Sequence, residues 1–189
     1  MTPPSTPPPA DLTRVRRRAR EVEDESWIRD FLARSPMCTI ATSAGEQPFL
    51  NSTLFLYDAD AHVLYFHTAR EGRTRSNIEA NGKVCVSVSE MGRLLPGERA
   101  ADYSVEYASV TLFGIARVVT DPAEVRSVLE GQLRKYDPHR EPGRDYAPFT
   151  DPEAARATVY RIEITEWSAK RHQEPDDFPG AFHYGVAGS

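Results

Sequence analysis

Residues 61–88 read AHVLYFHTAREGRTRSNIEANGKVCVSV. This stretch joins a β-branched and aromatic run, a loop with three arginines, a short helical pattern closed by Asn81-Gly82, and a second strand-like run. The first N–H groups of a helix have no intrahelical partner, and the helix dipole favours an anion there. Because the planar fork of arginine suits phosphate oxygens, the stretch predicts a phosphate site. The loop arginines are Arg70, Arg73 and Arg75.

The loop carries further hydroxyl donors, since Thr68 and Thr74 bracket it. It lacks the glycine pattern of a dinucleotide fingerprint or a P-loop, so the phosphate belongs to another kind of ligand. The alternative is a solvated, charged loop, because exposed arginines usually need no explanation.

The composition is that of a soluble globular protein of one domain. The chain has 189 residues, of which 40% are hydrophobic and 27% are charged, enough for a core. The formal net charge of −5 argues against nucleic acid as a partner. A basic run at 14–20 is followed at once by acidic residues at 21–25, which indicates a self-neutralising helix or tail, with a nucleic-acid-binding arm as the alternative.

The sequence predicts a cytoplasmic protein without a membrane segment. It has no apolar run of about 18 residues and no apolar stretch of the kind that a secretory signal needs. Cys38 and Cys85 lie in strand-like runs outside any CxxC pattern. Two buried free thiols in a reducing compartment are expected, with a disulfide or a metal pair as the alternative.

Apolar periodicity and turn residues predict a mainly β fold with peripheral helices. Residues 90–103 and 137–152 read as irregular or loop segments because of their glycines and prolines. Six mostly antiparallel strands would leave exposed edges in an open sheet, so a small barrel is the economical closure. The expected strands are 37–42, 48–57, 62–68, 83–89, 107–119 and 157–167, and the expected helices are 26–34, a short one after the arginine loop, and 121–135.

Three regions of the chain are expected. Residues 1–23 form a Pro/Arg-rich segment predicted to be disordered, with five prolines among the first ten residues. Residues 24–172 form the folded domain. Residues 173–189 form a polar, glycine-rich tail that is expected to be flexible.

Four motifs together resemble a known family. They are DESWIRDFL at 24–32, VLYFHTAREGRTRSNI at 63–78, VSEMGRLLPGERAADYSVEYASVTLFGIARV at 88–118, and WSAK at 167–170. The chain resembles the FMN-binding split β-barrel proteins of the pyridoxamine 5′-phosphate oxidase superfamily, and within it the nitroimidazole-resistance-type flavoproteins. The resemblance implies a six-stranded antiparallel split β-barrel with FMN as cofactor.

The resemblance also implies roles for individual residues. The flavin ring is expected against Asn51, Ser52 and Thr53. The ribityl phosphate is expected at His67, Thr68, Arg73 and Thr74, helped by Arg70 or Arg75. Family members are usually homodimers with flavin sites at the interface, so Tyr107 and Ser109 are expected to reach the partner's flavin.

The chain departs from the true oxidases of the superfamily in two places. Thr74 stands where their pattern has a basic residue, which shifts the phosphate grip to Arg73. The C-terminal arginine-rich signature for pyridoxal phosphate is not found. Pyridoxamine 5′-phosphate oxidase activity itself is therefore not expected.

His67 has three readings. It is a hydrogen-bonded structural histidine, a proton donor or substrate clamp at the flavin, or a haem ligand, since some split-barrel relatives bind haem. The other histidines form no metal-ligand spacing, so no metal site is predicted. Tyr103, Tyr107 and Trp167 are expected to be core or interface aromatics.

The expected function is that of an FMN-dependent oxidoreductase. It would pass electrons from a reduced nicotinamide to a small acceptor such as a nitroaromatic, in the manner of a nitroreductase. The alternatives are a non-catalytic flavin- or haem-binding protein, acting as a sensor or storage module, and a reductase using the deazaflavin F420 on the same fold.

Overall fold

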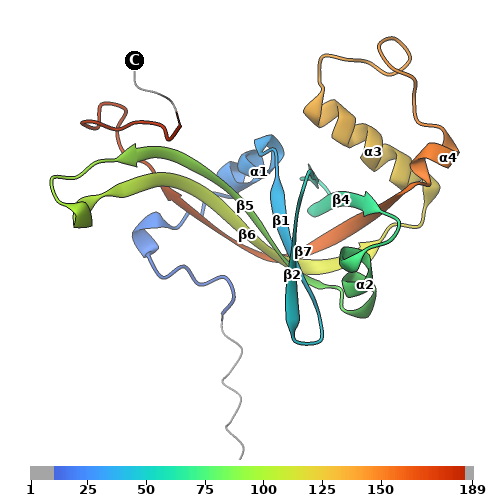
Figure 1. Cartoon of the computed structure of the whole chain (residues 1–189), viewed down its shortest axis with the longest axis horizontal. Coiled ribbons are helices and arrows are strands. Elements are labelled where there is room, and N and C mark those ends of the chain that lie inside the picture. The colour runs from blue at the N-terminus through green and yellow to red at the C-terminus, as the bar shows by residue number, and fades with distance from the viewer. Residues whose placement is uncertain (1–10, 186–189) are drawn as a thin grey trace, which may run out of the picture.

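All the strands that the structure describes belong to a single sheet. The structure is a computed structural model that describes residues 11–185; the expected disorder of 1–10 and the expected flexibility of 186–189 fall outside that range. Seven antiparallel strands lie in the order β2-β1-β5-β6-β7-β4-β3 (Figure 1). They are β1 (Cys38–Ala44), β2 (Gln47–Thr53), β3 (Leu56–Asp58), β4 (Val63–Ala69), β5 (Lys83–Leu95), β6 (Ser104–Val118) and β7 (Ala157–His172).

The predicted class, a mainly β split barrel, is confirmed, but the strand count of six was one too low. The run expected as a single strand at 48–57 divides into β2 and β3, which pair with different neighbours, β1 and β4. The break falls at Leu54-Phe55, where the Phe55 side chain is fully buried. A long hydrophobic run cannot show this division, because both halves keep strand character.

The sheet curls because its two outermost strands are consecutive in the chain. β2 ends at Thr53 and β3 begins at Leu56, so a span of three residues brings the two edges within about 11 Å. The end of α3 (Pro122–Tyr136) fixes this corner: Tyr136 Oη accepts from Phe55 N at 3.0 Å, and Lys135 Nζ donates to Phe55 O at 3.1 Å. β2 and β3 do not pair with each other, which leaves the barrel split.

The helices begin where the sequence supplies caps. In α1 (Glu25–Arg34) the Asp24 side chain accepts from the N–H groups of Ser26 and Trp27, and in α3 the Asp121 side chain accepts from Ala123. The remaining helices are α2 (Arg73–Ala80), α4 (Asp151–Ala154) and the 3-10 turns η1 (Arg18–Arg20) and η2 (Ala100–Asp102). No described helix is long and apolar enough to cross a membrane.

Two apolar clusters lie on opposite faces of β4. Leu64 and Phe66 join the barrel core, where the Phe66 ring stacks on Tyr160 with centroids 4.6 Å apart. Val63 and Tyr65 face the other way, into a cluster under α3 and α4. Gly131 permits the close approach of α3 to β3, since a Cβ there would lie 2.7 Å from Leu56 Cδ2.

β5 and β6 continue beyond the barrel as a long two-stranded arm (Figure 1). The expectation that 90–103 is irregular was wrong for residues 90–95 and holds for 96–103, which form a loop with the 3-10 turn η2. β5 runs on to Leu95, β6 starts at Ser104, and pairing continues past an irregularity between Met91 and Leu94. Glycine and proline in this segment mark the bulge and the turn rather than the end of the sheet.

The segments that flank the domain pack against β7 and the arm. Val15 is 1% exposed, and Val22 N donates to Ala169 O at 3.0 Å beside an isolated bridge between Glu21 and Lys170. In the tail, Phe182 pairs with Leu94 through two backbone hydrogen bonds of 2.7 and 3.1 Å. Described residues of both flanking segments therefore contact the domain directly.

Candidate functional site

The start of α2 lies beside β2 because of contacts to β1. Asn77 Nδ2 donates to Thr42 Oγ1 at 3.0 Å, in a contact between two buried side chains. Thr42 on β1 is paired with Phe49 on β2. One helical turn before Asn77, the Arg73 guanidinium lies over the Phe49 ring at 5.4 Å. The sheet register and one buried hydrogen bond thus bring Arg73 to β2.

The first turn of α2 is open to an anion. Its N-cap is Gly72, and no side chain caps the first N–H groups. Gly72 has φ +146°, a conformation that other residues rarely adopt. Thr74, the second residue of the helix, is 7% exposed. Backbone donors and the positive end of the helix dipole therefore lie next to the Arg73 side chain.

The three loop arginines differ in how free their charge is. Arg75 is engaged: its Nε donates to Glu79 Oε1 at 2.7 Å and its Nη1 to Arg70 O at 2.8 Å. Within residues 11–185, Arg70 and Arg73 form no ion pair with a carboxylate. Arg73 is thus the loop arginine that combines a free charge with a fixed position.

Two of the three β2 residues expected at the flavin ring face the barrel interior. Asn51 pairs with Ile40 and Thr53 with Cys38, both of which are buried core residues. Asn51 and Thr53 are only half-buried, on the same face as Phe49. Ser52 lies on the opposite face, where its hydroxyl is 2.9 Å from Thr39 Oγ1.

His67 and Thr68 point away from each other, as neighbours in a strand must. Thr68 Oγ1 lies 3.1 Å from Tyr160 Oη on the core side. His67 faces α3, with its Nδ1 2.6 Å from Gln132 Oε1. With the amide oxygen toward the ring, Nδ1 donates the proton and Nε2 is left as the acceptor nitrogen.

His67 lines a cavity of about 610 Å³ between the end of β4, α3 and the segment before β7. The walls are mostly apolar, with Leu54, Leu129 and Phe149 among them. Gln132 is 5% exposed and its Nε2 has no hydrogen-bond partner among the described residues. The structure therefore places His67 in a ligand-sized cavity on the other face of β4 from the core.

Tyr107 and Ser109 lie on β6, in the part of the sheet that leads into the arm, paired with His172 and Lys170 of β7. Two strands, β1 and β5, separate β6 from β2 in the sheet. The single chain thus leaves these two apart from the other predicted site residues.

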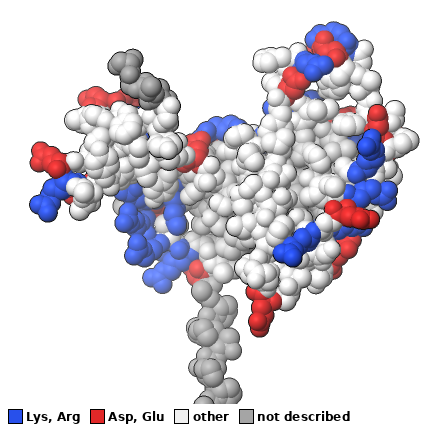
Figure 2. Space-filling model, in the orientation of Figure 1, with Lys and Arg blue, Asp and Glu red and all other residues white. Residues whose placement is uncertain are grey.

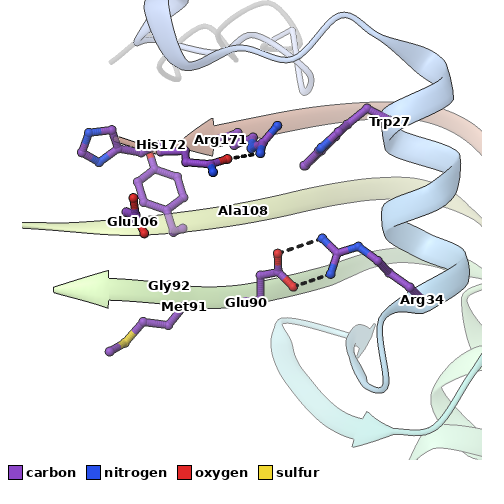
Figure 3. Close-up of a pocket in the computed structure, with 11 residues that line it drawn as sticks. Trp27, Arg34, Glu90, Met91, Gly92, Glu106, Ala108, Arg171 and His172 are labelled. Carbon is purple, nitrogen blue, oxygen red and sulfur yellow. Dashed lines mark hydrogen bonds and ion pairs between the residues drawn. The ribbon is translucent and has the colours of Figure 1, made fainter. Parts of the chain in front are cut away.

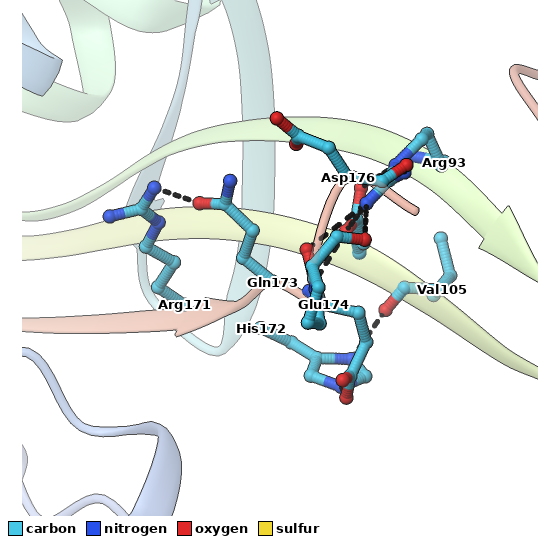
Figure 4. Close-up of polar contacts among 9 residues, drawn as sticks. Arg93, Val105, Arg171, His172, Gln173, Glu174 and Asp176 are labelled. Atoms are coloured by element: carbon cyan, nitrogen blue, oxygen red, sulfur yellow. Dashed lines mark hydrogen bonds and ion pairs between the residues drawn. The ribbon is translucent and has the colours of Figure 1, made fainter. Parts of the chain in front are cut away.

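The arm and the tail are joined by a paired arginine (Figure 4). Arg93 donates two hydrogen bonds to the Glu106 carboxylate, from Nη2 to Oε1 at 2.6 Å and from Nε to Oε2 at 2.8 Å. It also donates to the backbone carbonyls of Glu174, Pro175 and Asp176. The hydrogen bonds from Arg93 and from Glu174 N lower the pKa of Glu106 to about 2. The charge of Arg93 is therefore used to hold the tail.

A half-buried lysine and a buried cysteine lie near the barrel corner. Burial lowers the pKa of Lys135 to about 8, and burial raises the pKa of the Cys38 thiol to about 12. Cys38 and Cys85 are both free thiols, as expected, with Cys38 buried and Cys85 half-buried. Among residues 11–185 no cluster of His, Cys, Asp or Glu could hold a metal ion.

Sequence reasoning missed three contributors to these sites. Phe49 and Asn77 position Arg73 through β1, and only the strand register reveals this. Gln132 could have been found, because it is a polar residue on the apolar face of the helix that carries Val128 and Leu129.

Comparison with known proteins identifies the family. The family model for pyridoxamine 5′-phosphate oxidase matches residues 24–171. The chain belongs to this family. A search of curated proteins finds no match.

Solved structures share the fold. The flavocytochrome Anf3 from Azotobacter vinelandii has a TM-score of 0.79 at 23% identity, over 96% of this chain and 88% of that one. The FAD and haem binding protein from Mycobacterium smegmatis has a TM-score of 0.73 at 22% identity, over 84% and 76%. A candidate 5-nitroimidazole antibiotic resistance protein from Bacteroides thetaiotaomicron has a TM-score of 0.66 at 21% identity, over 80% and 86%.

Proposed function

We propose that the protein is an FMN-binding oxidoreductase that passes electrons from a reduced nicotinamide to a small acceptor such as a nitroaromatic. The observation that carries the proposal is the free Arg73 guanidinium at the uncapped start of α2, beside the half-open inner face of β2. A flavin phosphate needs such an anchor, and its ring needs an apolar wall with a few amide-type contacts. The similar structures named as a flavocytochrome and as an FAD and haem binding protein add support.

The residues present fit this cofactor. Arg73, Arg70 and the first N–H groups of α2 would hold the phosphate, with Thr74 as a further donor. Asn51 and Thr53 would contact the ring, on the strand face that also carries Phe49. Bound FMN would supply the redox chemistry.

His67 is the residue proposed to act on the substrate. Its Nδ1 contact with Gln132 fixes the ring, so Nε2 is the nitrogen that would hold or pass a proton in the 610 Å³ cavity. His67→Gln should then leave FMN bound and lower turnover by roughly 10²–10⁴. Turnover per bound FMN that is unchanged across a panel of nitroaromatics and quinones would remove His67 from catalysis.

A second candidate function is haem binding without catalysis. It is favoured by the same histidine, because a ring fixed at Nδ1 presents Nε2 in the way that metal-ligating histidines do. The visible spectrum of the purified protein separates the two. Bands at about 370 and 450 nm indicate flavin, and a Soret band at about 410 nm indicates haem.

The proposed assembly is a homodimer with a flavin site at each side of the interface. Exposed apolar side chains support an interface: Leu50 is 64% exposed on β2 and Met91 is 55% exposed on β5. The partner's Tyr107 and Ser109 would then complete the flavin site. Light scattering should give about twice the chain mass of 21.2 kDa, and a monomer that holds one FMN per chain would contradict this assembly.

A further inference from the structure

Most arginines of the chain pair with a carboxylate, and those that do not pair gather in two places. Arg70 and Arg73 form the first group, at the start of α2. A second group surrounds the N-terminal segment and the end of β7, and Arg99 and Arg156 stand alone. Within residues 11–185, the second group without a carboxylate partner is Arg14, Arg16, Arg17, Arg20 and Arg171.

The backbone brings the members of this second group to one surface. The N-terminal segment runs beside β7, with Val22 N bonded to Ala169 O and Glu21 bridged to Lys170. Figure 2 shows Lys and Arg side chains gathered below the arm, over the segment that Figure 1 draws in blue. A local basic surface on a chain of net charge −5 attracts anions.

A hollow of about 540 Å³ opens between the N-terminal segment and the chain that follows β7. Arg20 and Arg171 line it from the two sides. A second hollow of about 330 Å³ adjoins it, sharing Arg171 and Gln173 and reaching Trp27 and Tyr107 (Figure 3). Together the two hollows have the size of a small-molecule site.

The two lining arginines are held by aromatic rings rather than by carboxylates, and Arg171 Nη2 also donates to Gln173 Oε1. The Arg171 guanidinium lies 5.7 Å from the Trp27 ring centroid, and Arg20 lies 5.8 Å from that of Tyr107. Trp27 itself stacks on Phe31, with centroids 5.1 Å apart and an interplanar angle of 17°. Stacking fixes a guanidinium without consuming its charge, and its outer face can receive a further flat ring.

Two of the three acidic residues that line the larger hollow have a basic side chain beside them. Glu21 pairs with Arg18 at 2.6 Å, and Glu174 Oε1 lies 3.1 Å from His172 Nε2. Asp176 is the lining carboxylate without an ion pair in the described part of the chain. Two free guanidiniums therefore face one free carboxylate.

We propose that this hollow binds the diphosphate of a nucleotide, with Arg20 and Arg171 on the phosphates and the base stacked on the outer face of Arg171. Arg14, Arg16 and Arg17 steer the anion toward it. The site is distinct from the flavin phosphate anchor at Arg73. Two ligands carry this chemistry: a nicotinamide dinucleotide, and a flavin adenine dinucleotide whose single diphosphate lies here instead of at Arg73.

The test is titration calorimetry of the full chain with ADP. The variants Arg171→Gln and Arg20→Gln are compared with the control Arg99→Gln. Arg99 is exposed, lies outside the hollow and has no carboxylate partner among the described residues. We expect ADP to bind the wild type, each lining variant to weaken it roughly tenfold or more, and the control to bind unchanged. Arg171→Lys keeps the charge but loses the fork, and should fall in between. Thermal denaturation confirms that each variant is folded.

Two further comparisons locate the site and name the source of the phosphate. Arg73→Gln should retain ADP affinity while losing FMN affinity, which separates this inference from the proposed flavin site. Displacement of ADP by FAD or by NADH supports the proposal and shows which dinucleotide occupies the hollow. The proposal is overturned if the wild type does not bind ADP, if Arg171→Gln binds ADP as well as the wild type does, if only Arg73→Gln weakens binding, or if neither dinucleotide competes.

Discussion

The start of α2 and the N-terminal basic surface both present arginines without carboxylate partners, but they hold them by different means. At α2, Arg73 lies over Phe49 beside uncapped backbone N–H groups. At the basic surface, Arg20 and Arg171 lie over Tyr107 and Trp27. Trp27 belongs to the first turn of α1, but Asp24 already caps the N–H groups there. The first arrangement has fixed backbone dipoles in addition to charge, whereas the second relies on side chains alone.

This difference teaches how to read an arginine-rich sequence. The sequence alone does not distinguish the arginines of these two groups from Arg93. In the structure Arg93 is paired with Glu106 and holds the tail. Whether an arginine is available to a ligand depends on the carboxylates around it, which only the fold reveals. A paired arginine should affect stability when it is replaced, and a free one should affect ligand affinity.

Replacement of the paired Arg93 should have the largest effect. Arg93→Met leaves Glu106, which is 8% exposed, without its main partner, and should lower the free energy of unfolding more than the loss of an exposed ion pair does. Urea denaturation measures this. The matched control is Arg117→Met, whose pair with Glu163 is exposed and should cost about 0–1 kcal/mol.

The pH dependence of the same pair follows from its carboxylate. The pKa of Glu106 is lowered to about 2 in the fold, so its stabilisation is present above the unfolded pKa of about 4.3 and is lost as the pH falls through 2. The difference between wild type and Arg93→Met should therefore shrink as the solution is acidified. A difference that stays constant from neutral pH down to 2 would mean that the Arg93–Glu106 pair does not stabilise the fold.

Replacement of the free Arg73 comes next in size. Arg73→Ala should weaken FMN binding by about 1.5–3 kcal/mol, roughly 10- to 150-fold, by removing a charge-assisted contact to the phosphate. Arg75→Ala is the control two residues away, because Arg75 is already paired with Glu79. Fluorescence titration of flavin into the cofactor-free protein gives both affinities. Equal losses of FMN affinity in the two variants would contradict the distinction between free and paired arginines.

Lys135 tests what happens to a cation that is half-buried and has no carboxylate partner among the described residues. Its Nζ lies 3.7 Å from the Phe55 ring centroid, and its pKa is lowered to about 8 from an ordinary 10.5. Between these values the unfolded chain holds the proton and the folded chain does not, so the free energy of unfolding should rise with pH, by about 1–3 kcal/mol. Denaturation of wild type and Lys135→Met from pH 7.5 to 10.5 checks this; parallel curves would show that Lys135 keeps an ordinary pKa.

The smallest effect is expected from arginines at the rim of the basic surface. Arg16→Gln combined with Arg17→Gln should lower ADP affinity by about twofold at low salt, because these side chains act only through the local potential. The effect should vanish at about 0.5 M salt, where charges are screened within a few ångströms. A loss that persists in high salt would place these two arginines in direct contact with the ligand.

The barrel and its helices could be predicted largely from residue patterns. A run of β-branched and aromatic residues predicted the strand at 62–68, and Asp121-Pro122 predicted the start of α3. The division of 48–57 could not be predicted, because it depends on Tyr136 and Lys135 holding Phe55 from a distant helix. The arm was missed because glycines that interrupt a pattern can mark a bulge as well as a loop.

The candidate site could be predicted in part. The sequence indicated Arg73 and the helix start, and in the structure Arg73 lies over Phe49, on the face of β2 that also carries Asn51 and Thr53. The sequence prediction did not include that Ser52 faces outward. Side chains alternate strictly along a strand, so the middle one of the three neighbours 51–53 has to face away from the other two. The opposite directions of His67 and Thr68 follow from the same rule, but the cavity on the His67 side depends on α3.

The most direct test of the central claim is the affinity of the wild-type protein for FMN relative to riboflavin. The two ligands share the ring and differ in the phosphate, so their ratio isolates the anchor at Arg73 and the start of α2. We predict that cofactor-free protein binds FMN at least about tenfold more tightly than riboflavin, by fluorescence titration at low salt. Equal affinities would contradict the account, because the free arginine beside the helix would then hold no phosphate.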